Sequence, residues 1–208
     1  MVKTWVARHI STVKVMLHGA ALLPLCWLAW QTFSQQLGGD PVQYLTHFTG
    51  KGALNLLFIT LLISPVAKWI KWGFLLQTRR LLGLWVLAYA LIHVGIFWLL
   101  DLAGRIDLFV EEVIKRPYIT LGLIALLLLI ALGITSANRI RRKMGRNWQK
   151  LHNWVYLIVL LVPIHYYWSV KSAVFEPTIY LIIAALLLLL RRQKLMAYIP
   201  KKIRPKVA

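Results

Sequence analysis

The sequence predicts an all-α polytopic membrane protein, a bundle of six transmembrane helices with both termini in the cytoplasm. Three observations predict this class: 60% of the 208 residues are hydrophobic, these residues form long runs, and the charges divide between alternate loops. Runs of roughly 17–25 apolar residues can cross a membrane as helices, which satisfy their own backbone hydrogen bonds. The loops are too short for a separate soluble domain, so we expect a single transmembrane domain over 1–208.

Six apolar runs are long enough to be membrane spans. In chain order they are about 13–33, 52–70, 80–100, 117–135, 151–168 and 175–191, followed by a basic C-terminal tail at 192–208. The first run follows basic residues, as in a signal peptide. It is nevertheless too long and lacks a small-residue cleavage site, so we expect it to be a retained helix.

The charged residues assign the loops to two sides of the membrane. Of the 25 Lys and Arg residues, 20 lie in the N-terminal segment, the loops after the second and fourth runs, and the C-terminal tail. The other three loops hold all six acids: Asp40, Asp101, Asp107, Glu111, Glu112 and Glu176. By the positive-inside rule the basic side is cytoplasmic. The net charge of +19 therefore reflects membrane topology and is not evidence for nucleic-acid binding.

Several classes of function and site are disfavoured by what the sequence lacks. Cys26 is the one cysteine, which excludes an internal disulfide, a cysteine-based zinc site and a C-x-x-C-H haem attachment. No internal repeat is apparent, which argues against a transporter built from inverted halves. Apart from Glu176 at the edge of the last run, the predicted spans hold no acidic residue, and the chain has only four methionines, which argues against a metal route or a proton relay.

Four of the six histidines lie within or at the ends of the predicted spans: His18, His93, His152 and His165. Ionisable residues inside a membrane are costly and commonly functional. His93 lies 13 residues beyond Arg80, and His165 lies 13 beyond His152. At ~1.5 Å per residue, both are roughly 20 Å from the inner ends of their helices. Two neutral imidazoles at one depth can be axial ligands of a haem iron, while His152 belongs to a layer near the cytoplasmic face.

The spacing also leaves a structural alternative open. Thirteen residues of a straight helix leave the last side chain roughly 220° away from the first, so His152 and His165 need a kink to share a face. Pro163 can supply that kink. A histidine in a membrane helix often only bridges neighbouring helices, and this interpretation stays open for His18. His152 is close enough to the membrane interface to be a solvated residue at a helix end, and that alternative also stays open. We place His47 in the first periplasmic loop, ahead of the second span.

Seven short segments stand in a recognisable order and spacing: LHGAALLPLCWLAW, DPVQYLTHFTGKGAL, LLISPVAK, TRRLLGLW, KRPYITLG, NWQKLHNWVYL and PIHYYWSVK. Together they resemble the MsrQ (YedZ) family over nearly the whole chain. That family is the haem-containing membrane subunit of the periplasmic methionine sulfoxide reductase system. It is related to the ferric reductase-like transmembrane domain.

The resemblance implies a cofactor set and a redox route. The cofactors are b-type haem, one or two per chain, and FMN. Electrons would cross the bacterial inner membrane from the quinone pool or a cytosolic flavin reductase. The acceptor would be a periplasmic molybdopterin reductase, which reduces methionine sulfoxide and so repairs oxidised periplasmic proteins. Carried over to this chain, the ligands of the haem iron fall on His93, His152 and His165.

An inner haem site would lack its second histidine, because Arg79 or Arg80 stands where one is expected. These arginines suit a haem propionate or an FMN phosphate. They are equally well interpreted as positive-inside residues at a helix end. With His18, they are our candidates for inner-haem, FMN or quinone contacts, and the number of haems stays open.

Two further expectations concern partners and the rival class. The acidic outer loop 101–116, DLAGRIDLFVEEVIKR, is predicted to dock the periplasmic partner by charge complementarity. The alternative is a non-redox small transporter or membrane assembly subunit whose histidines are structural. That alternative predicts a colourless protein.

Overall fold

The computed structural model describes residues 9–170 and 172–192, and this part of the chain is helical with no strand. The predictions for residues 1–8 and for the tail beyond Arg192 lie outside the described residues. The elements are α2 (Ile10–Phe33), α3 (Pro41–Trp69), the 3₁₀ helix η1 (Gly73–Thr78), α4 (Arg79–Ile96), the π-helix η2 (Phe97–Asp101), α5 (Ile106–Lys115), α6 (Pro117–Ile134), α7 (Asn138–Met144), α8 (Arg146–His152), α9 (Val155–Ser169) and α10 (Phe175–Leu189).

Four helical segments are long and apolar enough to cross a membrane: Ile10–Phe33, Pro41–Trp69, Gly73–Asp101 and Pro117–Ile134. Helices α9 and α10 have 15 residues each. At ~1.5 Å per residue, such a helix is about 22 Å long, which is less than the hydrocarbon thickness of about 30 Å. The chain is a multi-pass membrane protein, and the count of six spans stays a prediction.

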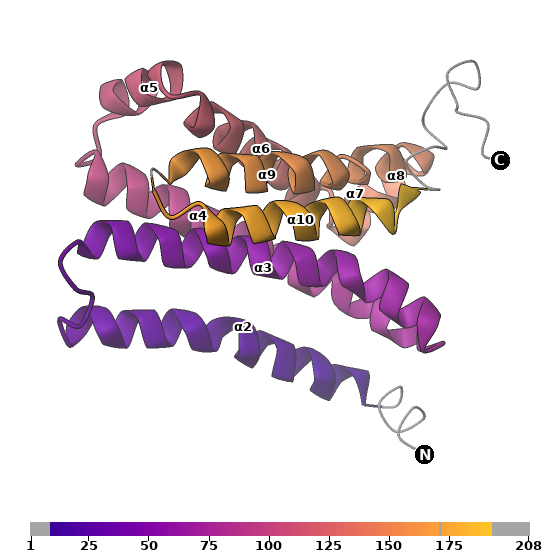
Figure 1. The fold of residues 1–208 in the computed structure, drawn as a ribbon. Coiled ribbons are helices and arrows are strands. Elements are labelled where there is room, and N and C mark those ends of the chain that lie inside the picture. The colour runs from indigo at the N-terminus through magenta and orange to yellow at the C-terminus, as the bar shows by residue number, and fades with distance from the viewer. Residues whose placement is uncertain (1–8, 171, 193–208) are drawn as a thin grey trace.

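The helices form one bundle. Helices α2, α3, α4, α6, α9 and α10 run roughly side by side, and the start of α2 lies at the same end as the end of α10 (Figure 1). Helix α5 and the connections from α2 to α3 and from α9 to α10 lie at the opposite end (Figure 1). All six acidic residues belong to these connections or directly adjoin them. The bundle therefore separates acidic and basic ends, while which end faces the cytoplasm stays a prediction.

The buried core comes from five of the helices. It consists of Leu54, Leu57, Phe58, Leu61, Val86, Ala125, Leu129, Leu132, Ile158, Val159, Ala184 and Leu187, from α3, α4, α6, α9 and α10. Helix α3 packs mainly on α4, and α6 packs mainly on α9. Helix α2 contributes no member to this core, and Ala21 and Leu28 are its only buried residues. The two packed pairs are therefore the centre of the bundle, with α2 at its edge.

The placement of His47 in a loop is wrong. Helix α3 begins at Pro41, not near residue 52, so His47 lies inside it. Asp40 caps the helix by accepting a hydrogen bond from the backbone N–H of Gln43 at 2.9 Å. Proline at the first helical position completes a standard helix start, because its missing N–H would have no partner there.

Segment 101–116 is also not the loop we expected. Residues Ile106–Lys115 form α5, whose charged side is held by local ion pairs such as Arg116 Nε to Glu112 Oε2 at 2.8 Å. Ion pairs between side chains four positions apart stabilise short helices. The predicted span at 151–168 is interrupted by a turn at Asn153 and Trp154, between α8 and α9. The straight-helix phase calculation for His152 and His165 therefore does not apply.

Candidate cofactor site

His93 and His165 lie together in the bundle. They come from α4 and α9, their ring centroids are 6.2 Å apart, and the ring planes are almost perpendicular at 88°. Both side chains are half-buried. The short distance between the ring centroids places the two side chains at one level of the bundle. His47, at the edge of the same region, packs its ring against Tyr166 with centroids 6.4 Å apart.

Each of the two imidazoles is oriented by a backbone carbonyl. His93 Nδ1 lies 2.9 Å from the Thr46 carbonyl oxygen, and His165 Nδ1 lies 2.7 Å from the Tyr118 carbonyl oxygen. Because a carbonyl can only accept, both Nδ1 atoms carry the proton and donate it. In a neutral ring the lone pair is then on Nε2. A histidine that donates through one nitrogen to a carbonyl is the usual form of a metal-ligating histidine.

A glycine makes room for each ring. A Cβ at Gly50 would lie 3.0 Å from His93 Nδ1, and a Cβ at Gly122 would lie 2.9 Å from His165 Cε1 and Nδ1. A glycine inside a helix weakens the helix by roughly 1 kcal/mol relative to alanine, so its use needs a local reason. Here the reason is the close approach of an imidazole to the backbone of the adjacent helix.

These contacts repeat in the two packed helix pairs. In the α3–α4 pair, Thr46 and His93 are 47 residues apart, and in the α6–α9 pair Tyr118 and His165 are also 47 residues apart. In both pairs the glycine follows the carbonyl residue by four positions. We call each set of carbonyl, glycine and histidine a half-site. No repeat is apparent in the sequence because the segments joining the helices differ, η1 in one pair and α7 and α8 in the other.

His152 belongs to a separate cluster. Its Nε2 lies 3.1 Å from Thr135 Oγ1, and its ring stacks on Trp148 with centroids 4.0 Å apart. The Trp148 indole donates to the Thr135 carbonyl oxygen at 2.9 Å, and the Arg141 guanidinium lies 4.9 Å from the centre of the Trp148 ring. Arg79 is near enough to act on His152 electrostatically. This cluster adjoins the basic end of the bundle, away from the His93–His165 pair.

The donor set fits a haem iron held by two histidines. In the part of the chain that the structure describes, no three His, Cys, Asp or Glu side chains converge as ligands for a bare metal ion. A haem brings its own porphyrin ligands, so the protein would need to supply only two histidines to hold it. His93 and His165 have the tautomer, the separation and the glycine clearance for that role.

Residues 49–163 match the family described as ferric reductase like transmembrane component. The match spans more than half of the chain and includes α4 with His93 and the end of α8 with His152. The chain belongs to this family. Ferric reductase-like domains generally bind haem, and they are membrane electron-transfer components. Of the two half-site histidines, His93 lies within the matched residues and His165 lies just beyond them, and the chemistry of both fits the cofactor of this family.

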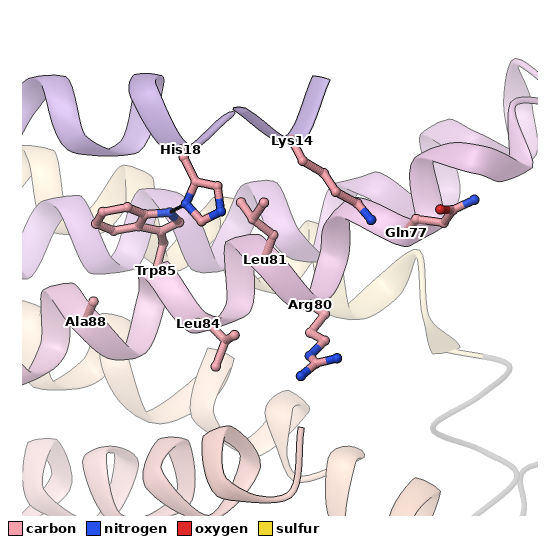
Figure 2. A pocket seen from close by; sticks show the side chains of 8 residues that line it. All are labelled: Lys14, His18, Gln77, Arg80, Leu81, Leu84, Trp85 and Ala88. Atoms are coloured by element: carbon pink, nitrogen blue, oxygen red, sulfur yellow. Dashed lines mark hydrogen bonds between the residues drawn. The ribbon is translucent and has the colours of Figure 1, made fainter. Parts of the chain in front are cut away.

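The other predicted contacts of this ferric reductase-like domain are dispersed. Arg80 Nη1 donates to Asn138 Oδ1 at 2.8 Å, and His18 Nδ1 accepts from the Trp85 indole at 3.0 Å. Arg80 and His18 line one pocket between α2 and α4, shown in Figure 2. Arg79 does not line that pocket and is near enough to His152 and Arg191 to act on them electrostatically.

Arg191 is a buried residue that the sequence analysis missed. We counted it among the basic residues of the C-terminal end, but only 8% of it is exposed, and its Nη2 donates to the Leu61 carbonyl oxygen at 2.7 Å. It lies near enough to Arg79 for mutual electrostatic repulsion. Its position directly after an apolar run was the available signal. A buried arginine next to a second cation favours an anionic group nearby.

Proposed function

We propose that this chain is the haem b membrane subunit of a methionine sulfoxide reductase system in the bacterial inner membrane. It carries electrons from the quinone pool or a cytosolic flavin reductase to a periplasmic molybdopterin reductase. Reduction of methionine sulfoxide takes place in that partner. The observation that carries the proposal is the pair of half-sites, each with a histidine held by a carbonyl and cleared by a glycine.

His93 and His165 are the proposed ligands of the outer haem. The carbonyls of Thr46 and Tyr118 hold the protons on Nδ1, so both Nε2 lone pairs are available for iron. When bound, a haem with two histidine ligands accepts and releases one electron and has no open position for oxygen. The apolar helices around the pair exclude water, which keeps the site suited to electron transfer.

The His152 cluster is the proposed entry point at the cytoplasmic end. His152 is the candidate ligand of a second haem, and Thr135 and Trp148 orient its ring. Arg79 and Arg191 supply positive charge for a haem propionate or an FMN phosphate, groups that a guanidinium binds with two parallel hydrogen bonds. One or two haems per chain are compatible with this arrangement, and FMN is assigned to the same end.

The absorption spectrum of the purified protein tests the proposal. We expect a reduced-minus-oxidised spectrum of haem b in the detergent-solubilised protein, and a pyridine haemochrome assay gives the number of haems. His93→Ala or His165→Ala should remove the outer haem, and His152→Ala should remove a second haem. His47→Ala is the matched control, since His47 is a nearby histidine outside both half-sites.

The rival class makes the opposite prediction. If the protein is colourless when it is produced with sufficient haem, the proposal is refuted and the histidines are structural. Loss of haem in the His47→Ala control to the same extent as in His93→Ala would also refute the ligand assignment. Partner specificity is tested separately, by measuring methionine sulfoxide reduction by the periplasmic reductase on proteoliposomes supplied with a quinol.

A further inference from the structure

Helix α2 is joined to the bundle by few side chains. Two hydrogen bonds connect it to α4: the Trp85 indole donates to His18 Nδ1 at 3.0 Å, and the Tyr89 hydroxyl donates to the Ala21 carbonyl oxygen at 2.7 Å. Near the basic end, an open pocket of about 360 Å³ lies between the two helices. Because α2 adds nothing to the buried core, this pocket is where another molecule can fill the space between α2 and α4.

The lining of the pocket changes from charged to apolar with depth. Figure 2 shows Lys14 and Gln77 toward one end, His18 with Trp85 farther along, and Ala88 at the other end. Lys14 is near the start of α2, and Arg80 is the second residue of α4. Leu81, Leu84 and Ala88 complete the wall. The polar rim is therefore at the basic end of the bundle, and the apolar wall extends toward the membrane interior.

His18 offers a hydrogen-bond donor inside this pocket. An indole N–H can only donate, so His18 Nδ1 is the acceptor and the proton of the neutral ring is on Nε2. His18 is exposed, at one helical turn, or ~6 Å, beyond Lys14. A donor at this depth next to hydrocarbon needs an acceptor, since an unsatisfied polar group in lipid costs several kcal/mol.

We propose that this pocket binds an anionic glycerophospholipid of the cytoplasmic leaflet. The phosphate binds Lys14 and the guanidinium of Arg80, which turns from its present partner Asn138 to reach it. An ester carbonyl accepts from His18 Nε2, and an acyl chain follows Leu81, Leu84 and Ala88. The cations lie at one end of the pocket, and His18 and the apolar residues lie beyond them, as the ester groups and acyl chains of such a lipid lie beyond its charged headgroup. Basic pockets between transmembrane helices on the cytoplasmic side are suited to anionic headgroups.

Other ligands fit only part of the lining. A quinone head can accept from His18 but has no negative charge for the two cations. The phosphate of FMN can meet the cations, but FMN has no chain for the apolar wall. The proposal rests on the cytoplasmic placement of the basic end and does not depend on haem binding. It assigns His18 and Arg80 a role different from the cofactor contacts that the sequence suggested.

Native mass spectrometry of the full-length protein tests the proposal. The protein is released from nanodiscs that contain equal amounts of phosphatidylglycerol and phosphatidylcholine with identical acyl chains. We expect one retained phosphatidylglycerol, with at least a 10-fold preference over phosphatidylcholine. The double variant Lys14→Gln, Arg80→Gln should lose the preference. Lys68→Gln, Lys71→Gln is the matched control, because these basic residues are near the same end and do not line the pocket.

A second variant addresses folding. Ala88→Leu leaves the charges intact and fills the apolar end of the pocket, so it should reduce lipid retention several-fold while the protein stays monodisperse in gel filtration. Equal retention of the two lipids by the wild type would overturn the proposal. So would displacement of the retained lipid by millimolar inorganic phosphate, by FMN or by a short-chain quinone, each of which would assign the pocket to that ligand.

Discussion

Replacing Gly122 or Gly50 with alanine should weaken haem binding through the adjacent histidine. The new Cβ at Gly122 would lie 2.9 Å from His165 Cε1 and Nδ1, and at Gly50 it would lie 3.0 Å from His93 Nδ1. Carbon atoms in favourable contact are about 3.5–4.0 Å apart, so the ring has to move by roughly 0.5–1 Å. The hydrogen bond from His165 to the Tyr118 carbonyl, now 2.7 Å, would lengthen toward the limit for such bonds.

The magnitude follows from these two effects. Overpacking costs about 1–3 kcal/mol, and a weakened hydrogen bond costs about 0.5–1.5 kcal/mol. Changes to groups that orient a metal ligand typically reduce metal affinity by about 10–100-fold. We therefore expect Gly122→Ala to bind haem about 10–100-fold more weakly in a titration of the apoprotein, with a shifted midpoint potential. Gly50→Ala should have the same effect at the other histidine, of similar size.

Two other glycines are controls. A Cβ at Gly83, which is in the same helix as His93, would meet nothing within 4 Å, so Gly83→Ala should leave haem affinity unchanged. A Cβ at Gly52 would lie 2.5 Å from Tyr89 Cε1, so Gly52→Ala causes a clash outside the half-sites. It should lower the melting temperature with little change in the midpoint potential. The reasoning fails if Gly122→Ala and Gly83→Ala bind haem equally well.

Three further predictions concern the inner cluster, the docking surface and helix α5. Thr135→Val removes the hydroxyl partner of His152 Nε2. It should change the haem-to-protein ratio or the spectrum of an inner haem while leaving the outer haem intact. An unchanged spectrum would show that Thr135 does not orient a ligand. Glu111→Lys with Glu112→Lys should slow electron delivery to the periplasmic reductase at low ionic strength and less at high salt; stopped-flow rates unaffected by the double change would count against docking at α5. The hydrogen bond from Arg105 lowers the pKa of the Asp107 carboxyl, so this pair supports α5 above the ordinary carboxyl pKa and is lost as the pH falls through the lowered value. A spin label on α5 should therefore gain mobility only under acid conditions, and Asp107→Asn should remove that pH dependence.

The positions of most helices along the chain could be predicted from the sequence. Apolar runs and the charge distribution located the helices of the bundle, and counting residues from the helix ends placed His93 and His165 at one level. These features depend on local composition and on the fixed rise of a helix. These rules placed the start of α3 too late, because the helix-start residues Asp40 and Pro41 lie ahead of the apolar run.

The details of the site were not accessible in this way. The carbonyl partners of His93 and His165 and the clearance at Gly50 and Gly122 depend on which helices pack together and on their rotation. Arg191 is similar, because its burial results from packing against α3 rather than from its own neighbours in sequence. Helix α5 is short and carries charge, so composition alone marked it as a loop.

The repeated half-sites have a consequence for how the protein assembles. Each helix pair holds its own histidine, carbonyl and glycine, so each can present a prepared ligand before the other has been inserted into the membrane. Helix α5 and its flanking turns are the linker between these two units. Haem would then bind a histidine from each of the two separately formed helix pairs. Its binding free energy would stabilise the packed pairs relative to the separated ones. We therefore expect the apoprotein to lose the contacts between the α3–α4 pair and the α6–α9 pair first, while the helices within each pair stay packed.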